Sequence, residues 1–314
     1  MRNNYKPVLA AVVLSMVLLV GCTELPGKAD SNPGQNTAEE VVQQDFGAAL
    51  QQKIGEATAN IEQNVENAVD QVTESVKSKG VSEQLSVSEE IGSSSVLDID
   101  NPVGEIKVLP ASGNQMTVNA TLWFKNNPSH EDDRQQILDN AEVSIQIAGD
   151  EVKVSTYAKD DPQKDIWSWA QDKVDYSDFS VDYVIEVPDG VDTFQITNNV
   201  GEVNLRDLKG TYRIVSNIGA VNISGAEVTG KSTVETNTGS IHLEIAGMSA
   251  DSSLKAKTDI GGLTAVLDDS LKCSLETKSE LGAITGAPGG KSIINGGGPL
   301  LSLFSSVGSI TINK

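Results

Sequence analysis

Seven copies of one short motif constrain the fold of this chain more than any other feature of its sequence. Each copy joins a small polar segment, a glycine and a short alternating apolar pattern, as in Ser216-Asn-Ile-Gly219-Ala-Val-Asn-Ile. The glycines are Gly104, Gly201, Gly219, Gly239, Gly261, Gly282 and Gly308. The last six are separated by 18, 20, 22, 21 and 26 residues, a period typical of stacked repeat units.

Apolar residues keep fixed distances from each glycine. Two residues after it stand Ile106, Val203, Val221, Ile241, Leu263, Ile284 and Ile310, and apolar side chains also prevail five and seven residues before it. This alternation indicates two short strands per coil, which bury their apolar sides only when coils stack at about 4.8 Å. We therefore predict a mainly β chain in which residues 85–314 form a parallel β-solenoid, with tandem coils over residues 194–314.

The turn before each glycine also repeats. We expect a structural ladder built from the residues two before the glycine and from the glycines themselves, namely Asn199, Asn217, Asn237, Asp259, Gly201, Gly219, Gly239 and Gly261. Asn and Asp tolerate left-handed turns and bond locally, which favours a turn role. The alternative is a row of side chains that binds a cation or a sugar.

Residues 109–193 interrupt the repeats with different content. Residues 116–124 and 179–187 are predicted strands, residues 128–140 a short helix, and residues 141–157 a hairpin around Gly149-Asp150. We expect this insertion to cap the first coils and shield the edge of the solenoid.

The N-terminus has the pattern of a secretory leader. Arg2 and Lys6 precede an apolar run from Val8 to Val20, and Leu19-Val20-Gly21-Cys22 follows. The tetrapeptide resembles the lipobox of bacterial lipoproteins, and that resemblance implies a signal peptide over residues 1–21, cleavage before Cys22, and lipidation of Cys22 with palmitate-type chains. The alternative is an uncleaved membrane anchor.

Two segments separate this leader from the repeats. Residues 22–37 are rich in Pro, Gly, Asn and Ser, which indicates a flexible linker. Residues 38–80 carry apolar positions at an 11-residue step, which predicts one long amphipathic helix ending at Gly80. This helix is expected to be a stalk that lifts the following domain off the membrane. The alternatives are self-association through residues 38–79, a helix lying on a membrane, which the excess of acidic residues disfavours, and a helix that covers a face of the following domain.

The acidic composition argues against nucleic-acid binding. The net charge is −21 and the pI near 4.4, so no nucleic-acid partner is expected. Beyond Cys22 the one remaining cysteine, Cys273, alternates with leucines and is predicted to be buried.

The residues suited to catalysis or metal binding are scattered. His130 and His242 are far apart in sequence, Asp268-Asp269 has the pattern of a charged turn, and the acids do not recur at one coil position. We therefore expect no enzyme activity, no metal site and no cofactor.

Aromatic residues concentrate in the insertion. Asp165, Trp167, Trp169 and Tyr176 suggest an exposed aromatic and acidic patch that binds a partner, if the segment is extended. The alternative is that these rings fill the core beneath the insertion.

The run Val184-Ile-Glu-Val-Pro-Asp-Gly190, followed by the Asn-x-Val-Gly-x-Val units, resembles the bacterial envelope family named putative adhesins, an autotransporter-adhesin-like β-strand-repeat domain of unknown function. The resemblance covers residues 85–314. It implies a β-solenoid in the cell envelope and carries no catalytic residues.

Three functions follow as hypotheses. The first is a lipid-anchored envelope protein, at the outer membrane, in the periplasm or on the cell surface, whose non-catalytic solenoid presents a binding or adhesion surface to an envelope protein or glycan. The second is a β-helix that binds or cleaves glycans. The third is an architectural spacer assembled through the helix.

Overall fold

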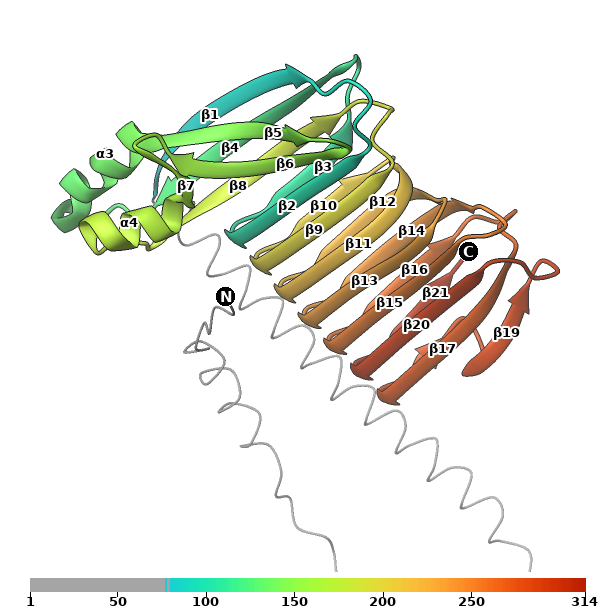
Figure 1. The fold of residues 1–314 in the computed structure, drawn as a ribbon. Helices are drawn as coiled ribbons and strands as arrows, with labels where there is room; N and C mark the ends of the chain where they lie inside the picture. The colour runs from blue at the N-terminus through green and yellow to red at the C-terminus, as the bar shows by residue number, and fades with distance from the viewer. Residues whose placement is uncertain (1–76, 78–79) are drawn as a thin grey trace, which may run out of the picture. The chain divides into compact units, whose positions relative to one another are not determined.

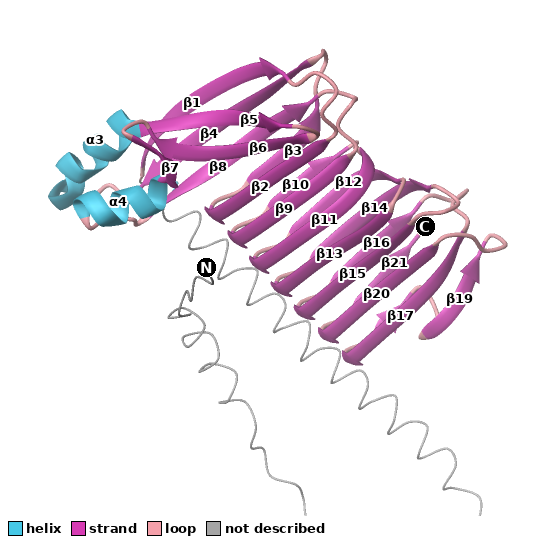
Figure 2. Ribbon diagram, viewed as in Figure 1, coloured by secondary structure: helices cyan, strands magenta, loops and turns pink. Residues whose placement is uncertain are grey.

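The computed structural model describes residue 77 and residues 80–314 (Figure 1). The predicted leader, Cys22, the linker and the predicted helix, except for residues 77 and 80, lie outside the described residues. The described chain is mainly β, and its strands form an open array that does not close on itself (Figure 2).

Seven repeat units, each made of two strands on either side of one motif glycine, form most of this array. The strand before the glycine lies in one sheet, here called sheet B, and the strand after it lies in sheet A. The sheet B strands are β2 (Val96–Val103), β9 (Thr193–Val200), β11 (Lys209–Ile218), β13 (Lys231–Thr238), β15 (Ser253–Ile260), β17 (Cys273–Leu281) and β20 (Leu300–Val307). The sheet A strands are β3 (Ile106–Pro110), β10 (Val203–Arg206), β12 (Val221–Val228), β14 (Ile241–Met248), β16 (Leu263–Leu267), β18 (Ile284–Thr285) and β21 (Ile310–Asn313).

Equivalent residues of neighbouring units face each other in parallel register. Ile214 lies between Ile196 and Val234, and Val221 lies between Val203 and Ile241. These residues are at most 1% exposed, so the apolar positions predicted from the motif do form continuous buried rows. Burial of each such aliphatic side chain stabilises the fold by about 1.5–3 kcal/mol.

The last two units do not stack in sequence order. Strand β20 pairs with β15 on one side and β17 on the other, and β21 lies between β16 and β18. The tandem order expected over residues 194–314 is therefore wrong at its end. The longest spacing among the last six motif glycines, 26 residues, contains β19 (Gly290–Ile294), which runs antiparallel to β17 before the chain enters the inner position.

The insertion extends both sheets beyond the first unit. Strand β8 (Phe179–Val187) pairs with β3 and with β4 (Gln115–Phe124), and β4 pairs with β1 (Val81–Glu90). In sheet B, β6 (Glu151–Ala158) pairs with β2, with β5 (Ala141–Ala148) and with β7 (Asp161–Asp165). The short helix η2 (Pro128–His130), α3 (Glu131–Asn140) and α4 (Ile166–Val174) lie at the end of these strands (Figure 2).

Candidate functional site

The motif glycines are required by how closely the turns stack. Gly219 has φ of 141°, and a β-carbon placed on it would lie 2.0 Å from the carbonyl oxygen of Gly201. Its own N–H donates to the carbonyl of Thr238 in the next unit at 2.9 Å. The turn therefore accepts no larger residue, because the neighbouring backbone already occupies the space of a side chain.

A second row, three residues before the motif glycines, supports most of the turns from inside. The hydroxyl of Thr258 donates to the carbonyl of Gly239 at 2.9 Å, and the hydroxyl of Ser305 donates to that of Gly261 at 3.1 Å. Asn198 bonds the carbonyl of Gly104 in the same way at 3.2 Å. The sequence analysis did not predict this hydrogen-bonding role. The pattern that indicates it is nevertheless present, because every aligned copy of the motif begins with Asn, Ser or Thr.

The predicted exposed ladder is present over three units. Asn217 donates to the side-chain oxygen of Asn199 at 2.6 Å, and Asn237 donates to that of Asn217. Asp259 departs from the row, because its carboxylate pairs with Lys257 at 2.7 Å. Since each of these amides bonds the next one along the stack, the row links turns.

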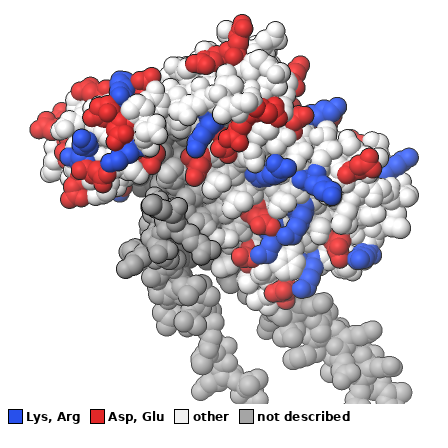
Figure 3. Space-filling model, viewed as in Figure 1, with Lys and Arg blue, Asp and Glu red and all other residues white. Residues whose placement is uncertain are grey.

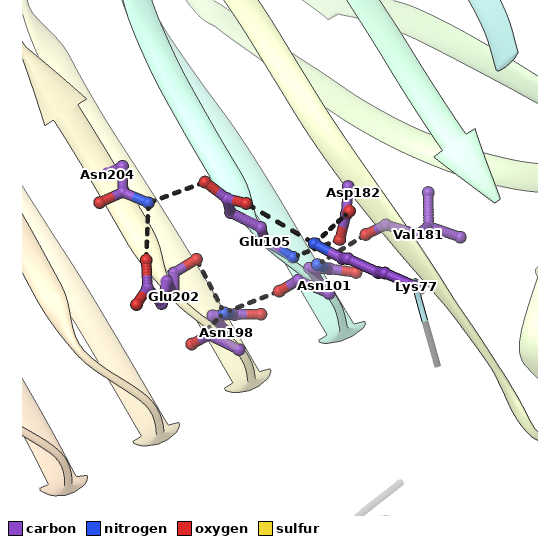
Figure 4. Close-up of polar contacts among 10 residues, drawn as sticks. Lys77, Asn101, Glu105, Val181, Asp182, Asn198, Glu202 and Asn204 are labelled. Atoms are coloured by element: carbon purple, nitrogen blue, oxygen red, sulfur yellow. Dashed lines mark hydrogen bonds and ion pairs between the residues drawn. The ribbon is translucent and has the colours of Figure 1, made fainter. Parts of the chain in front are cut away.

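One polar network joins Lys77 to strand β8 and to the first two units (Figure 4). The ammonium of Lys77 lies 2.7 Å from Asp182 and 3.7 Å from Glu105. Asn204 donates to Glu105 at 2.9 Å and to Glu202 at 3.2 Å. Three carboxylates, Asp182 on β8 and Glu105 and Glu202 in the turns before β3 and β10, are thus held by an ammonium and an amide, so the arrangement links Lys77 to sheet A.

Two buried amide oxygens lie beside this network. The Oδ1 atoms of Asn101 and Asn198 have no hydrogen-bond partner among the described residues, and both side chains are at most 1% exposed. Their Nδ2 atoms donate to backbone carbonyls, which fixes the orientation of both amides. Burial of these two oxygens without a hydrogen bond is unfavourable in free energy, and the packing of the stacked turns must offset that cost.

The predicted aromatic patch is not formed. Its segment is the helix α4, so Trp167 and Trp169 do not alternate along a strand. Trp169 and Tyr176 are buried, and Asp165 caps the helix by accepting from the Ser168 N–H at 2.8 Å. The exposed patch is therefore not formed, and the alternative, that the rings fill the core, holds for Trp169 and Tyr176.

The remaining aromatic contacts of this region are also packing contacts. Trp167 is half-buried, stacks on Phe179 at 5.5 Å and donates to its carbonyl at 3.2 Å. Tyr176 stacks on His130 at 4.5 Å, and burial raises the pKa of its hydroxyl. The rings therefore hold α3 and α4 against the strands.

Several single residues lie where the sequence analysis placed them. Cys273 is buried, and burial raises the pKa of its thiol. Asp268 accepts both the hydroxyl and the backbone N–H of Ser270, the latter at 2.8 Å, so it closes a turn, and these two bonds lower its pKa. Within residues 80–314 no cluster of three His, Cys, Asp or Glu side chains could hold a metal ion.

The outer face of sheet B bears a strip that the sequence analysis did not single out. On three adjacent strands Phe304 lies between Lys257 and Lys278, whose ammonium groups are 6.0 and 5.2 Å from the ring centre. We call this face, with the exposed Arg213, Val215 and Lys255, the sheet B strip. Red side chains predominate over the end with α3 and α4, whereas both signs mix over the repeat units (Figure 3).

The lysines of the strip each have an acidic neighbour. Lys255 pairs with Glu235 at 3.0 Å, and Lys278 pairs with Glu280 at 3.2 Å. The strip is therefore close to neutral on a chain of net charge −21.

Of the described helices, none has the length and apolar content to cross a membrane.

Comparisons with known proteins bring only remote similarity. No family model matches the chain, and no curated protein matches it. Among solved structures, a putative cell adhesion protein from Clostridium sporogenes aligns with a TM-score of 0.41 at 10% identity, over 75% of this chain and 99% of that one. A putative adhesin from Bacteroides fragilis aligns with a TM-score of 0.25 at 11% identity, over 73% and 97%. A putative lipid binding protein from Parabacteroides distasonis gives 0.26 at 12%, over 74% and 97%.

Proposed function

We propose that this chain is a lipid-anchored protein of the cell envelope whose repeat units form a β-solenoid with a binding or adhesion surface and no catalytic role. The lipid would be attached at Cys22, after removal of residues 1–21. The helix predicted over residues 38–80 would hold the repeat units away from the membrane. The parallel register of the seven units supports the solenoid, because each unit repeats the path of the unit beside it.

One observation carries the binding role. Phe304, the only aromatic residue after Tyr212, stands on the outer face of sheet B between two lysines and not in the core. An aromatic ring placed on a flat face, among side chains of both signs, provides stacking area together with polar groups that fix orientation. The stacked turns hold this face rigid, so binding would cost little ordering of the protein.

The test is a binding screen with matched variants. The chain from residue 22, with Cys22→Ser to prevent lipidation, is tested against envelope glycans and extracted membrane proteins. Phe304→Ala should weaken capture at least about tenfold, equivalent to about 1.4 kcal/mol. Val184→Ala, at an exposed position on sheet A, should leave it unchanged. Capture that survives Phe304→Ala would contradict this assignment of the surface.

The same ring favours a glycan as the second candidate function. Sugar rings stack on aromatic faces, and lysine and glutamate side chains beside the ring would bond their hydroxyl and acid groups. A glycan array separates the two candidates: retention of a defined oligosaccharide by the wild-type chain, lost in Phe304→Ala, would identify the ligand as carbohydrate.

A further inference from the structure

The repeat array ends in exposed apolar side chains. Ile293 is 71% exposed, Leu281 46% and Leu300 43%. Ile293 on β19 and Leu300 on β20 flank Ser274 of β17 at one register, so they lie on the same side of three adjacent strands. This is an apolar surface at the one end of the array that the insertion does not extend.

Strand β19 is also an edge strand. Among the described strands it pairs with β17 alone, so one row of its backbone N–H and C=O groups has no strand partner. Such an edge is a template for another strand. The opposite end of the array has edges too, but β1 carries Glu83, Glu89 and Glu90.

We infer that β19 is a self-association edge, at which two copies of this chain continue sheet B by antiparallel pairing about a twofold axis. An antiparallel pair of identical strands is the arrangement that a twofold axis produces, and it closes at two copies. Lys291 is the only charged residue of β19, so this edge avoids the acidic repulsion that a chain of net charge −21 otherwise imposes on its copies.

The sequence of β19 suits such a pairing. In a twofold pair centred on Ser292, Lys291 of one copy lies opposite Ile293 of the other, and both are exposed in the single chain. The methylene stem of Lys291 would then cover the isoleucine while its ammonium stays in water. No two like charges face each other in this register.

The experiment measures mass against concentration, by sedimentation velocity, from micromolar to near-millimolar chain. It uses the chain from residue 22 with Cys22→Ser. Three variants are compared: Ile293→Lys, which places two lysines opposite each other, Ile293→Glu, which places a glutamate opposite Lys291, and Ile147→Lys on edge strand β5, where Ile147 is 45% exposed. Circular dichroism and thermal unfolding confirm that each variant is folded.

We expect a monomer–dimer equilibrium whose Kd rises at least about tenfold in Ile293→Lys, less in Ile293→Glu, and not in Ile147→Lys. A wild-type monomer at all concentrations would overturn the inference. So would a dimer unaffected by Ile293→Lys, as when residues 38–79 hold the copies together, or a mass that grows without limit. Loss of the dimer with glycan binding retained would show that this edge and the sheet B strip act independently.

Discussion

The carbonyl oxygen of Gly201 occupies the position that a side chain on Gly219 would need: a β-carbon there would lie 2.0 Å from that oxygen. The same relation holds between Gly219 and Gly239 and between Gly239 and Gly261, each at 2.1 Å. The turns therefore stack backbone on backbone, and the spacing of paired strands leaves no room for a side chain between them.

Replacing one motif glycine should be severe. Gly219→Ala is expected to lower the free energy of unfolding by about 3 kcal/mol or more, because the added carbon meets a backbone oxygen and φ of 141° is strained for any other residue. Urea unfolding measures the change. Gly113→Ala is the control, since Gly113 has an ordinary φ and open space around it, and should change stability by less than about 0.5 kcal/mol.

The buried hydroxyls beside the turns should differ in their contribution to the free energy of unfolding, according to whether they donate a hydrogen bond. Thr258→Val removes the donor to the Gly239 carbonyl while keeping the shape, and should cost about 1–2 kcal/mol. Ser216→Ala removes a buried hydroxyl that has no partner among the described residues, so it should be close to neutral or stabilising. Equal losses in the two variants would contradict the role assigned to this row.

The region around η2, α3 and α4, here called the cap, should depend on the buried Trp169 for its stability. Trp169→Ala is expected to cost about 3–5 kcal/mol, because it leaves a large cavity beneath α4. Trp169→Phe should cost much less, since the indole N–H has no partner among the described residues. If Trp169→Ala kept full stability but abolished partner binding, the exposed patch predicted from the sequence would be correct after all.

Alkaline pH should destabilise the fold through Cys273. Burial raises the pKa of its thiol above the ordinary value near 9, so the unfolded chain ionises first and stability falls as pH rises through that value. The contribution cannot exceed about 1.4 kcal/mol per pH unit. The buried hydroxyls of Tyr183 and Tyr212 also have raised pKa values and act in the same direction at higher pH.

The comparison with Cys273→Ala isolates the thiol. The difference in unfolding free energy between the wild-type chain and this variant should be constant up to about pH 8 and should shrink above it. A difference that grows with pH would mean that the thiolate, and not the thiol, is favoured in the folded chain.

Much of the fold was predictable because the same motif, a glycine turn with alternating apolar residues around it, occurs seven times in the sequence. The glycine, the alternation around it and the Asn row at Asn199, Asn217 and Asn237 follow from local chemistry that sequence displays directly. The inversion of the last two units was not predictable, because parallel strands of equal pattern pair equally well in either order, and only the path of the loop through β19 decides between them.

The surface was harder to predict than the core. Trp167 and Trp169 suggested a binding site because aromatic residues are rare in this chain. In the helix that Asp165 caps, however, Trp169 is buried and Trp167 is half-buried. Phe304 lies on an alternating strand at an outward position, but its flanking lysines belong to strands 47 and 26 residues away in sequence. Such a cluster can be recognised only once the register of the stacked strands is known.

The proposed binding face is tested most directly by lysine footprinting of the captured complex. Labelling rates of Lys255, Lys257 and Lys278 are compared with those of Lys125 and Lys159 at the cap, with and without the ligand found in the screen. We predict that the three sheet B lysines become slower to label while the cap lysines do not change. Protection of the cap lysines, with the sheet B lysines unchanged, would contradict the account.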